Sequence, residues 1–344
     1  MSLLSPNVVG MTSVGVGTST ALSPTRSEAP SLPTASLSPS RAADFMSCPL
    51  RYRFRAIDRL PERSSPQAVR GTVVHAVLER LFDLPAAERT LEQASNLVGP
   101  EWHRLLAAAP ELADVAGDPA GQPCGVKPPQ AGQLPEWLTS ARKLLSGYFE
   151  LEDPQRLEPA EREHLVSVVL DSGLTLRGYI DRLDATPSGE FRVVDYKTGR
   201  TPGEAFEGKA LFQLKFYALV LWRTRGRIPA ELRLLYLNDS TMLRYTPDEG
   251  ELRAFERLLD ALWRAVARAT ATGDFRARRG VLCQWCDHQQ RCPEWGGTPP
   301  PLPPVQVPLA ASGLASATAA RGTRQSVALA AAPHTMADGT PTVT

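Results

Sequence analysis

The strongest chemical signal in the sequence is a pair of aspartates in one predicted hairpin, GYIDRLDATPSGEFRVVDYKTG, residues 178–199. If the turn is centred on Ser188, opposed residues have numbers that sum to 376, and Asp181 faces Asp195 directly. Directly opposed residues of an antiparallel pair have Cβ atoms roughly 4.5–5.5 Å apart. Two carboxylates at this separation repel each other unless a cation lies between them or one of them is protonated.

Lys197 adds an ammonium group to the same face, because it lies two residues beyond Asp195 on the predicted strand. Two carboxylates suit Mg²⁺ or Mn²⁺, which prefer hard oxygen ligands. Such an ion polarises a phosphate oxygen and lowers the pKa of bound water, and the lysine can position that water or neutralise charge on the phosphate. The structural alternative is a surface hairpin whose acids are solvated or paired with Arg182, Arg192 and Lys197. A β-bulge would change the register.

The chain has five cysteines, and four of them define a second candidate site. Cys283, Cys286 and Cys292 form a C-x2-C-x5-C pattern in CQWCDHQQRC. Three thiolates in one loop indicate a bound metal, and most soft-metal sites have four ligands. Cys48, in the segment SCPLRYRF, is the natural fourth ligand, and His288 is the alternative for a zinc ion. The pattern by itself leaves a zinc ion and an iron–sulfur cluster equally open.

Basic and aromatic residues alternate directly after this early cysteine, in Arg51, Tyr52, Arg53, Phe54 and Arg55. Arginines suit phosphate contacts and aromatic rings suit base stacking, so we interpret Arg51, Arg53 and Arg55 as candidate nucleic-acid-binding residues. A solvated amphipathic segment has the same pattern.

Another segment imitates a phosphate-binding loop. Gly203, Gly208 and Lys209 match the spacing G-x4-G-K, but Ala210 stands where the magnesium-binding Ser or Thr of such a loop belongs. The expected strand–loop–helix context is also missing from the pattern, so we reject an ATPase motor. Any helicase activity must therefore come from a partner protein.

The hairpin needs a sheet to hold it, and the rest of the sequence predicts further elements. Ser38–Pro39 is a good helix start, with Ser as N-cap and Pro as first helical residue, and apolar spacing predicts a helix over roughly Gln67–Leu84. A helical insert is expected over about 85–150, broken by the loop AGDPAGQPCGVKPPQAG, which holds a spare thiol, Cys124. The remaining predicted elements are strands at His164–Leu170, Leu174–Thr186, Glu190–Lys197 and 231–237, and helices near 203–224 and 248–272. This order fits an α+β or mixed α/β fold.

Composition sets limits on these assignments. The 344 residues are 42% hydrophobic, which allows a buried core, and the net charge is only +1, so bulk charge does not identify a nucleic-acid partner. Residues 1–37 and 298–344 lack amphipathic periodicity, so we expect both to be disordered and one domain to span 38–297. No stretch approaches the roughly 20 apolar residues of a membrane span. No basic residue precedes Arg26, and the cysteines are grouped like a metal site, so we expect a cytoplasmic protein.

Taken together, these segments resemble the RecB family of nucleases within the PD-(D/E)XK superfamily. GYID, VVDYKTG and QLKFYA match that family's motif series, GTVVHAVLE resembles its GxxxH helix, and SPSRAADFMSCPLRYRF resembles its N-terminal helix and cysteine-bearing turn. The motifs occur in the family's order and span about residues 38–295. The resemblance implies a restriction-endonuclease-like α/β fold, with a central mixed sheet flanked by helices.

The resemblance also implies roles for individual residues. The family's ligands for Mg²⁺ or Mn²⁺ correspond to His75, Asp181 and Asp195, and its catalytic lysine corresponds to Lys197. Glu163 is a candidate for a further acid. Taken alone, a histidine within VVHAV is more typical of a satisfied core residue, and it is the motif context that favours a ligand.

Two further features follow from the same resemblance. The family's QxxxY element, which lies near the active site and the DNA backbone, corresponds to Gln213 and Tyr217, which share a helix face at i, i+4. Core packing is the alternative for Tyr217. In the iron–sulfur, AddB-like subset of the family, one early and three late cysteines hold a [4Fe–4S] cluster, which matches Cys48 and the three late cysteines.

The sequence therefore predicts a Mg²⁺- or Mn²⁺-dependent deoxyribonuclease. We expect an exonuclease on single-stranded DNA or DNA ends that acts in DNA repair or recombination, together with a separate helicase or repair subunit. Two other hypotheses stay open at this stage. One is a catalytically silent subunit that binds or clamps DNA, and the other is a small zinc-stabilised interaction protein.

Overall fold

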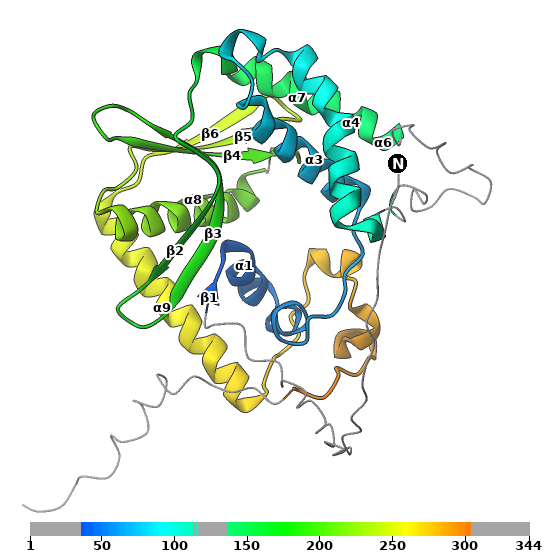
Figure 1. Ribbon diagram of the computed structural model, residues 1–344. Helices are drawn as coiled ribbons and strands as arrows, with labels where there is room; N and C mark the ends of the chain where they lie inside the picture. Colours follow the sequence, from blue (N-terminus) through cyan, green and yellow to red (C-terminus); the bar gives the residue numbers. More distant parts are fainter. Residues whose placement is uncertain (1–35, 113–114, 116–135, 202, 304–344) are drawn as a thin grey trace, which may run out of the picture. The chain divides into compact units, whose positions relative to one another are not determined.

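A computed structural model describes residues 36–112, 115, 136–201 and 203–303 of the chain (Figure 1). The predicted disordered segments, apart from residues 36–37 and 298–303, lie outside the described residues, and so does the loop with Cys124. Across the described ranges, every helix is either too short or too polar to cross a membrane.

A six-stranded mixed sheet forms the centre of the fold (Figure 1). Its strand order is β1-β3-β4-β5-β6, with β2 paired to β3, and the pairs β1–β3 and β4–β5 are parallel whereas the others are antiparallel. The strands are β1 Ser36–Leu37, β2 Glu161–Val169, β3 Thr175–Ala185, β4 Phe191–Lys197, β5 Glu231–Tyr236 and β6 Thr241–Tyr245. The mixed sheet was predicted, whereas β1 and β6 were not.

The predicted register of the hairpin is confirmed where β3 and β4 pair. Arg182 pairs with Val194, so opposed residues have numbers that sum to 376. The ladder stops there, and at the next position the carboxylate of Asp181 accepts a 2.7 Å hydrogen bond from the backbone N–H of Tyr196. Asp181 and Asp195 are thus the first opposed pair beyond the regular ladder.

The register between β2 and β3 adds a third carboxylate to this row. Residues 162 and 164 of β2 pair with residues 182 and 180 of β3, so Glu163 lies opposite Asp181. Glu163 has a left-handed backbone conformation, with a φ of 42°, which is uncommon for a residue other than glycine. The order across three adjacent strands is therefore Glu163, Asp181, Asp195.

Helices cover both faces of the sheet. Buried side chains of α8 Glu204–Arg225 and α9 Glu249–Thr272 form one core with β2 to β5. On the other face, β4 and β5 pack against α3 Pro66–Leu81, α4 Leu91–Ala108 and α7 Ala141–Leu151. A short helix, α6 Glu136–Thr139, precedes α7. The chain is therefore a helix–sheet–helix arrangement, as predicted, and the expected helical insert supplies α4, α6 and α7.

A third core joins the two ends of the described chain. It contains side chains of α1 Pro39–Ser47, α2 Pro49–Tyr52 and the π-helical turn η1 Arg53–Ile57, packed against the last turns of α9 and the segment that follows. The predicted N-cap is confirmed, because the Ser38 side chain accepts a hydrogen bond from the backbone of Arg41. The 3₁₀ turns are η2 Ala86–Glu88, η3 Pro110–Leu112, η4 Pro154–Arg156, η5 Val281–Trp285, η6 Gln289–Arg291 and η7 Pro293–Trp295.

The ordered part extends beyond both expected boundaries. Ser36–Leu37 form β1 rather than belonging to a disordered segment, and Leu37 is fully buried. At the other end, Leu302 packs against the third core, and the carbonyl of Pro300 accepts a hydrogen bond from Arg53. Apolar contacts of single residues hold these short segments, which a search for periodicity does not detect.

Candidate active site

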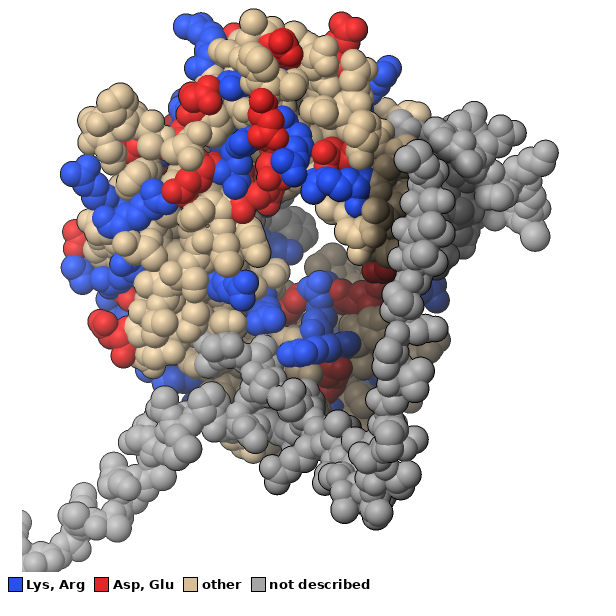
Figure 2. All heavy atoms as spheres, viewed as in Figure 1, with Lys and Arg blue, Asp and Glu red and all other residues tan. Residues whose placement is uncertain are grey.

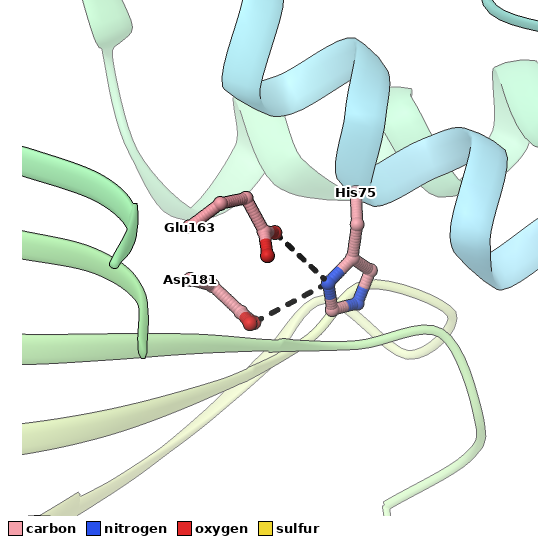
Figure 3. A group of neighbouring side chains, drawn as sticks. All are labelled: His75, Glu163 and Asp181. Carbon is pink, nitrogen blue, oxygen red and sulfur yellow. Dashed lines mark ion pairs between the residues drawn. The ribbon is translucent and has the colours of Figure 1, made fainter. Parts of the chain in front are cut away.

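Three side chains from separate elements converge at one end of the carboxylate row (Figure 3). His75 points from α3 toward the strands, and its Nδ1 lies 3.4 Å from an oxygen of Asp181 and 3.9 Å from an oxygen of Glu163. One ligand atom of each residue lies within 4.8 Å of the others. The His75 and Glu163 side chains are 28% and 34% exposed, so solvent reaches the group. One nitrogen and two carboxylates in this arrangement can hold a divalent cation.

A glycine allows α3 to approach the sheet at this point. A Cβ on Gly71 would lie 2.9 Å from Oγ1 of Thr198, the residue that follows the last residue of β4. His75 lies one turn further along α3, and the ring of Tyr196 meets its imidazole edge-on, with ring centroids 5.8 Å apart. The GxxxH spacing therefore has a packing basis, because the glycine brings the helix close enough for the histidine to reach the strands.

Asp195 belongs to a neighbouring hydrogen-bonded group. It is 2% exposed, and its carboxylate accepts a 2.7 Å hydrogen bond from the Gln213 amide and forms a 2.5 Å ion pair with Lys197. The Gln213 carbonyl accepts a 2.8 Å hydrogen bond from Lys197, and its amide reaches the Tyr217 hydroxyl at 3.4 Å. The four residues predicted from VVDYKTG and QLKFYA thus lie together, and Asp195 is outside the 4.8 Å group, in which Glu163 stands instead.

A second glycine places the α8 residues against the strand. A Cβ on Gly178 would lie 2.9 Å from the ring of Tyr217 and 3.7 Å from Cδ of Pro39. Tyr217 is 5% exposed, so it also packs in the core, and burial raises the pKa of its hydroxyl. Because Gly178 lacks a side chain, the tyrosine ring packs closely on β3, one turn of α8 beyond Gln213.

The charges of the two groups influence one another. Burial opposes protonation of His75, but the charge and hydrogen bond of Asp181, together with the charges of Asp195 and Glu163, outweigh burial and raise the pKa of His75 to about 9. Burial and repulsion from Asp181 raise the pKa of Glu163 to about 7. Burial also raises the pKa of Asp195 to about 6, although Lys197 opposes the rise. Burial opposes protonation of Lys197 as well, but the charge and hydrogen bond of Asp195, together with the charge of Asp181, outweigh it and raise the pKa of Lys197. Four acidic or basic groups thus compete for protons in the absence of a cation.

The four cysteines predicted to bind a metal are brought to one region. All four are free thiols. Backbone N–H groups point at two of the sulfurs, from Arg278 to Cys48 at 3.5 Å and from Gly280 to Cys283 at 3.3 Å. Burial raises the pKa of Cys286, the positive charge of Arg51 opposes that rise, and the charges of Cys292 and Cys48 add to it, so these thiols lie close enough to interact.

His288, the alternative zinc ligand, is held by a carboxylate. Its Nε2 lies 3.1 Å from a carboxylate oxygen of Glu62, and its ring meets Phe54 edge-on at 5.2 Å between centroids. The side chain is fully buried, and Nδ1 has no hydrogen-bond partner among the described residues. A carboxylate on one ring nitrogen and an unpaired second nitrogen are compatible with a metal ligand.

A cleft with a volume of about 1430 Å³ connects the active-site residues with the cysteine-bearing segments. Its walls include His75, Asp181, Asp195, Lys197 and Gln213, the exposed side of β3, the length of α1, and Leu282 of the cysteine segment. Figure 2 shows the hollow, with Lys and Arg side chains at several points of its rim. The basic residues of its lining are Arg41, Arg51, Arg55, Arg177, Lys197 and Lys209. Six basic side chains thus contribute to the lining of the cleft, beside the acids Asp44, Asp181 and Asp195.

The expected nucleic-acid contacts are only partly compatible with this geometry. Arg51 and Arg55 line the cleft, although both form ion pairs with Asp44, at 3.6 and 2.5 Å. Arg53 does not line it, and the prediction for Arg53 is wrong in this respect: it is 6% exposed and pairs with Asp58 at 3.0 Å. Its aromatic neighbours, Tyr52 and Phe54, are buried in the third core instead of being available for stacking.

Comparisons with known proteins bear on the same residues. A family model described as "PD-(D/E)XK nuclease superfamily" matches residues 36–293, which include the sheet and both candidate sites. "Gene 69 protein" of Mycobacterium phage D29 is 29% identical over 199 residues, which cover 54% of this chain and 69% of that protein. A crystal structure of "Putative exonuclease" from Eubacterium rectale covers 74% of this chain and 88% of its own, with 11% identity and a TM-score of 0.47.

Proposed function

Because the chain belongs to the PD-(D/E)XK nuclease superfamily, we propose that it is a metal-dependent deoxyribonuclease that hydrolyses phosphodiester bonds. We further propose the RecB-like subset, single-stranded DNA or DNA ends as substrate, and a role in DNA repair or recombination beside a separate helicase. The observation that carries the proposal is the row Glu163, Asp181, Asp195 across three strands, with His75 and Lys197 beside it. A surface hairpin gains nothing from a carboxylate that is 2% exposed, as Asp195 is.

The residues present fit a hard divalent cation. His75, Glu163 and Asp181 would hold Mg²⁺ or Mn²⁺, and Asp195 provides a further carboxylate in the adjacent position of the row. When bound, such an ion polarises a phosphate oxygen and makes bound water acidic. The hydrogen bond from the Tyr196 backbone fixes one oxygen of Asp181, so this ligand is oriented before the ion binds.

The chain's own residues would supply the rest of the chemistry. Lys197 is held by Asp195 and the Gln213 carbonyl and stays protonated, so it can neutralise charge on the phosphate in the transition state. Gln213 in turn ties Asp195 to Lys197 and fixes the distance between the acid and the amine. Fixed charges of this kind need no reorganisation during the reaction, which is the usual source of electrostatic catalysis.

We also propose that Cys48, Cys283, Cys286 and Cys292 hold a [4Fe–4S] cluster. Backbone N–H groups that point at the sulfurs are typical of such sites. One early and three late cysteines, in the order of the family's iron–sulfur subset, support the cluster over zinc. Zinc is the alternative, with the Nδ1 atom of His288 as a ligand. Anaerobically purified protein should be brown and contain iron and sulfide, and a colourless protein with stoichiometric zinc would reverse this assignment.

The test of nuclease function uses end-labelled linear and circular single-stranded DNA, each with Mg²⁺ and with Mn²⁺. We expect the full-length protein to degrade the linear strand. The variant Lys197→Ala should lose cleavage while it keeps its fold and its iron, and Lys143→Ala, an exposed lysine of α7 outside the cleft, is the matched control. If wild type and Lys197→Ala cleave equally well, the proposed active site is wrong. DNA binding without cleavage under either metal would instead indicate a clamping subunit.

A further inference from the structure

Building on the proposed nuclease function, we infer that Tyr179 and Leu165 form a base-stacking platform beside the metal site. The substrate then lies in the cleft as a single strand whose bases are unstacked from one another. Neither residue belongs to the catalytic groups described above. The platform would position the nucleotide next to the phosphate that is cleaved.

Tyr179 and Leu165 are paired directly across β3 and β2. Two residues further along each strand, Glu163 and Asp181 form the row with the candidate metal ligands, and Asp181 also lines the cleft. Tyr179 is 52% exposed and Leu165 is 40% exposed, and both line the cleft together with Asp181. A half-exposed aromatic ring and a leucine thus form an apolar surface directly beside the candidate metal ligands.

Folding does not explain this surface. On β3, Leu176 and Ile180 are buried in the core with α8 and α9, whereas Tyr179 is exposed and, by the alternation of side chains along a strand, points to the opposite side from Ile180. Large apolar side chains that stay exposed in a cleft mark a binding site more often than a structural need. Tyrosine offers a flat ring on which any base can stack, so its contact does not depend on sequence.

The spacing of side chains along β3 matches a nucleic-acid strand whose bases are not stacked on one another. Residues on one side of a strand repeat about every 6.6 Å, roughly twice the 3.4 Å rise per nucleotide of stacked DNA. A nucleic-acid strand in step with β3 must therefore separate its bases, which leaves each base free to stack on a side chain. A duplex cannot do so without unpairing.

The next position in the same direction provides a phosphate contact. Arg177 is exposed, lines the cleft and pairs with Ser167 in the row after Tyr179. The order along β3 is therefore metal ligand, aromatic ring and cation, at Asp181, Tyr179 and Arg177. This order matches what an extended strand presents, a phosphate at the metal followed by a base and a further phosphate.

The experiment measures kcat and KM on a short end-labelled single strand, intact or with one abasic nucleotide placed at successive positions. Loss of one base–aromatic contact weakens binding by roughly 5- to 150-fold. In wild type, one abasic position beside the cleaved phosphate should raise KM about tenfold. Tyr179→Ala should raise KM for the intact strand to the same extent and should no longer respond to the abasic position. Tyr179→Phe should behave like wild type.

Two controls separate stacking from other effects. Val169→Ala removes a 65% exposed residue of the same β2–β3 ribbon that does not line the cleft, and it should leave KM unchanged. Arg177→Gln should raise KM equally for intact and abasic strands and reduce the salt dependence by about one phosphate contact.

The possible results separate the platform from the nuclease assignment. If wild type cleaves but shows no abasic penalty at any position, or if Tyr179→Ala keeps the penalty, the platform is wrong and the nuclease stands. If wild type does not cleave any strand with either metal, the proposed function itself fails. If Tyr179→Ala does not fold, an absent abasic penalty in wild type still overturns the platform.

Discussion

Gly71 in α3 lies very close to Thr198, the residue after β4. A methyl group on Gly71 would lie 2.9 Å from Oγ1 of Thr198. This contact fixes how near α3 comes to the strands, and it lies one helical turn from His75. The distance between α3 and the strands thus depends on the glycine at position 71.

We predict that Gly71→Ala weakens Mn²⁺ binding about tenfold, because the added methyl group pushes α3 and His75 away from Asp181. The second substitution Thr198→Ala removes the hydroxyl and should restore binding in the double variant. Isothermal titration with Mn²⁺ measures the affinities. If Gly71→Ala binds as tightly as wild type, the close approach does not position the ligand.

Gln213 provides a second test, because it joins Asp195 to Lys197 without carrying a charge itself. We expect Gln213→Leu to lower kcat by roughly 10²-fold, as removal of one oriented hydrogen-bonding group does in other enzymes. KM should change little. A large rise in KM with kcat preserved would assign the residue to substrate binding instead.

Metal binding should release protons. At pH 7, His75 is protonated because its pKa is raised to about 9, and Glu163 is about half protonated because its pKa is raised to about 7. Both must lose their protons to bind a cation. We therefore expect a release of about one to two protons per ion at pH 7, and of less than about half a proton at pH 10, with affinity rising over this range.

Calorimetry in buffers of different ionisation enthalpy measures this release directly. Glu163→Gln should lower the number released at pH 7 while the contribution of His75 remains. A proton count of zero at pH 7 would contradict the proposed ligand set.

The cysteine site should hold the third core together. We predict that Cys48→Ser loses iron and lowers the Tm by about 4–8 °C, which corresponds to roughly 2 kcal/mol for a domain of this size. The variant Cys124→Ser should keep both iron and Tm. Thermal unfolding under anaerobic conditions measures the effect, and an unchanged iron content in Cys48→Ser would exclude this cysteine as a ligand.

The register of the hairpin could be predicted because the turn at residues 187–189 is short. Residues at equal distances from the centre of such a turn lie opposite each other, which leaves one register. The same reasoning missed the place of Glu163, which the sequence put before a strand. Glu163 has a left-handed φ of 42°, which interrupts the regular conformation of β2, and side-chain patterns do not predict such a conformation. The strand begins at Glu161, three residues earlier than its apolar alternation suggested.

The failure at Arg53 has a different cause. Alternation of basic and aromatic residues predicted phosphate contacts and base stacking, but Arg53 and Phe54 belong to a π-helical turn in which both are buried. The ion-pair partner of that arginine, Asp58, is only five residues away, but the carbonyl of Pro300 that accepts its hydrogen bond is 247 residues away. No local pattern connects Arg53 with that carbonyl, so its burial could not be predicted from the segment alone.

The cleft is built from both ends of the described chain, since α1 forms one wall and Leu282 closes it beside the cysteine segment. During synthesis, the carboxylate row is finished once β4 has been made, yet the channel around it stays open until nearly ninety further residues have left the ribosome. A nascent chain therefore carries the acidic residues before the segment with Leu282, which completes the wall of the cleft beside α1, has been synthesised.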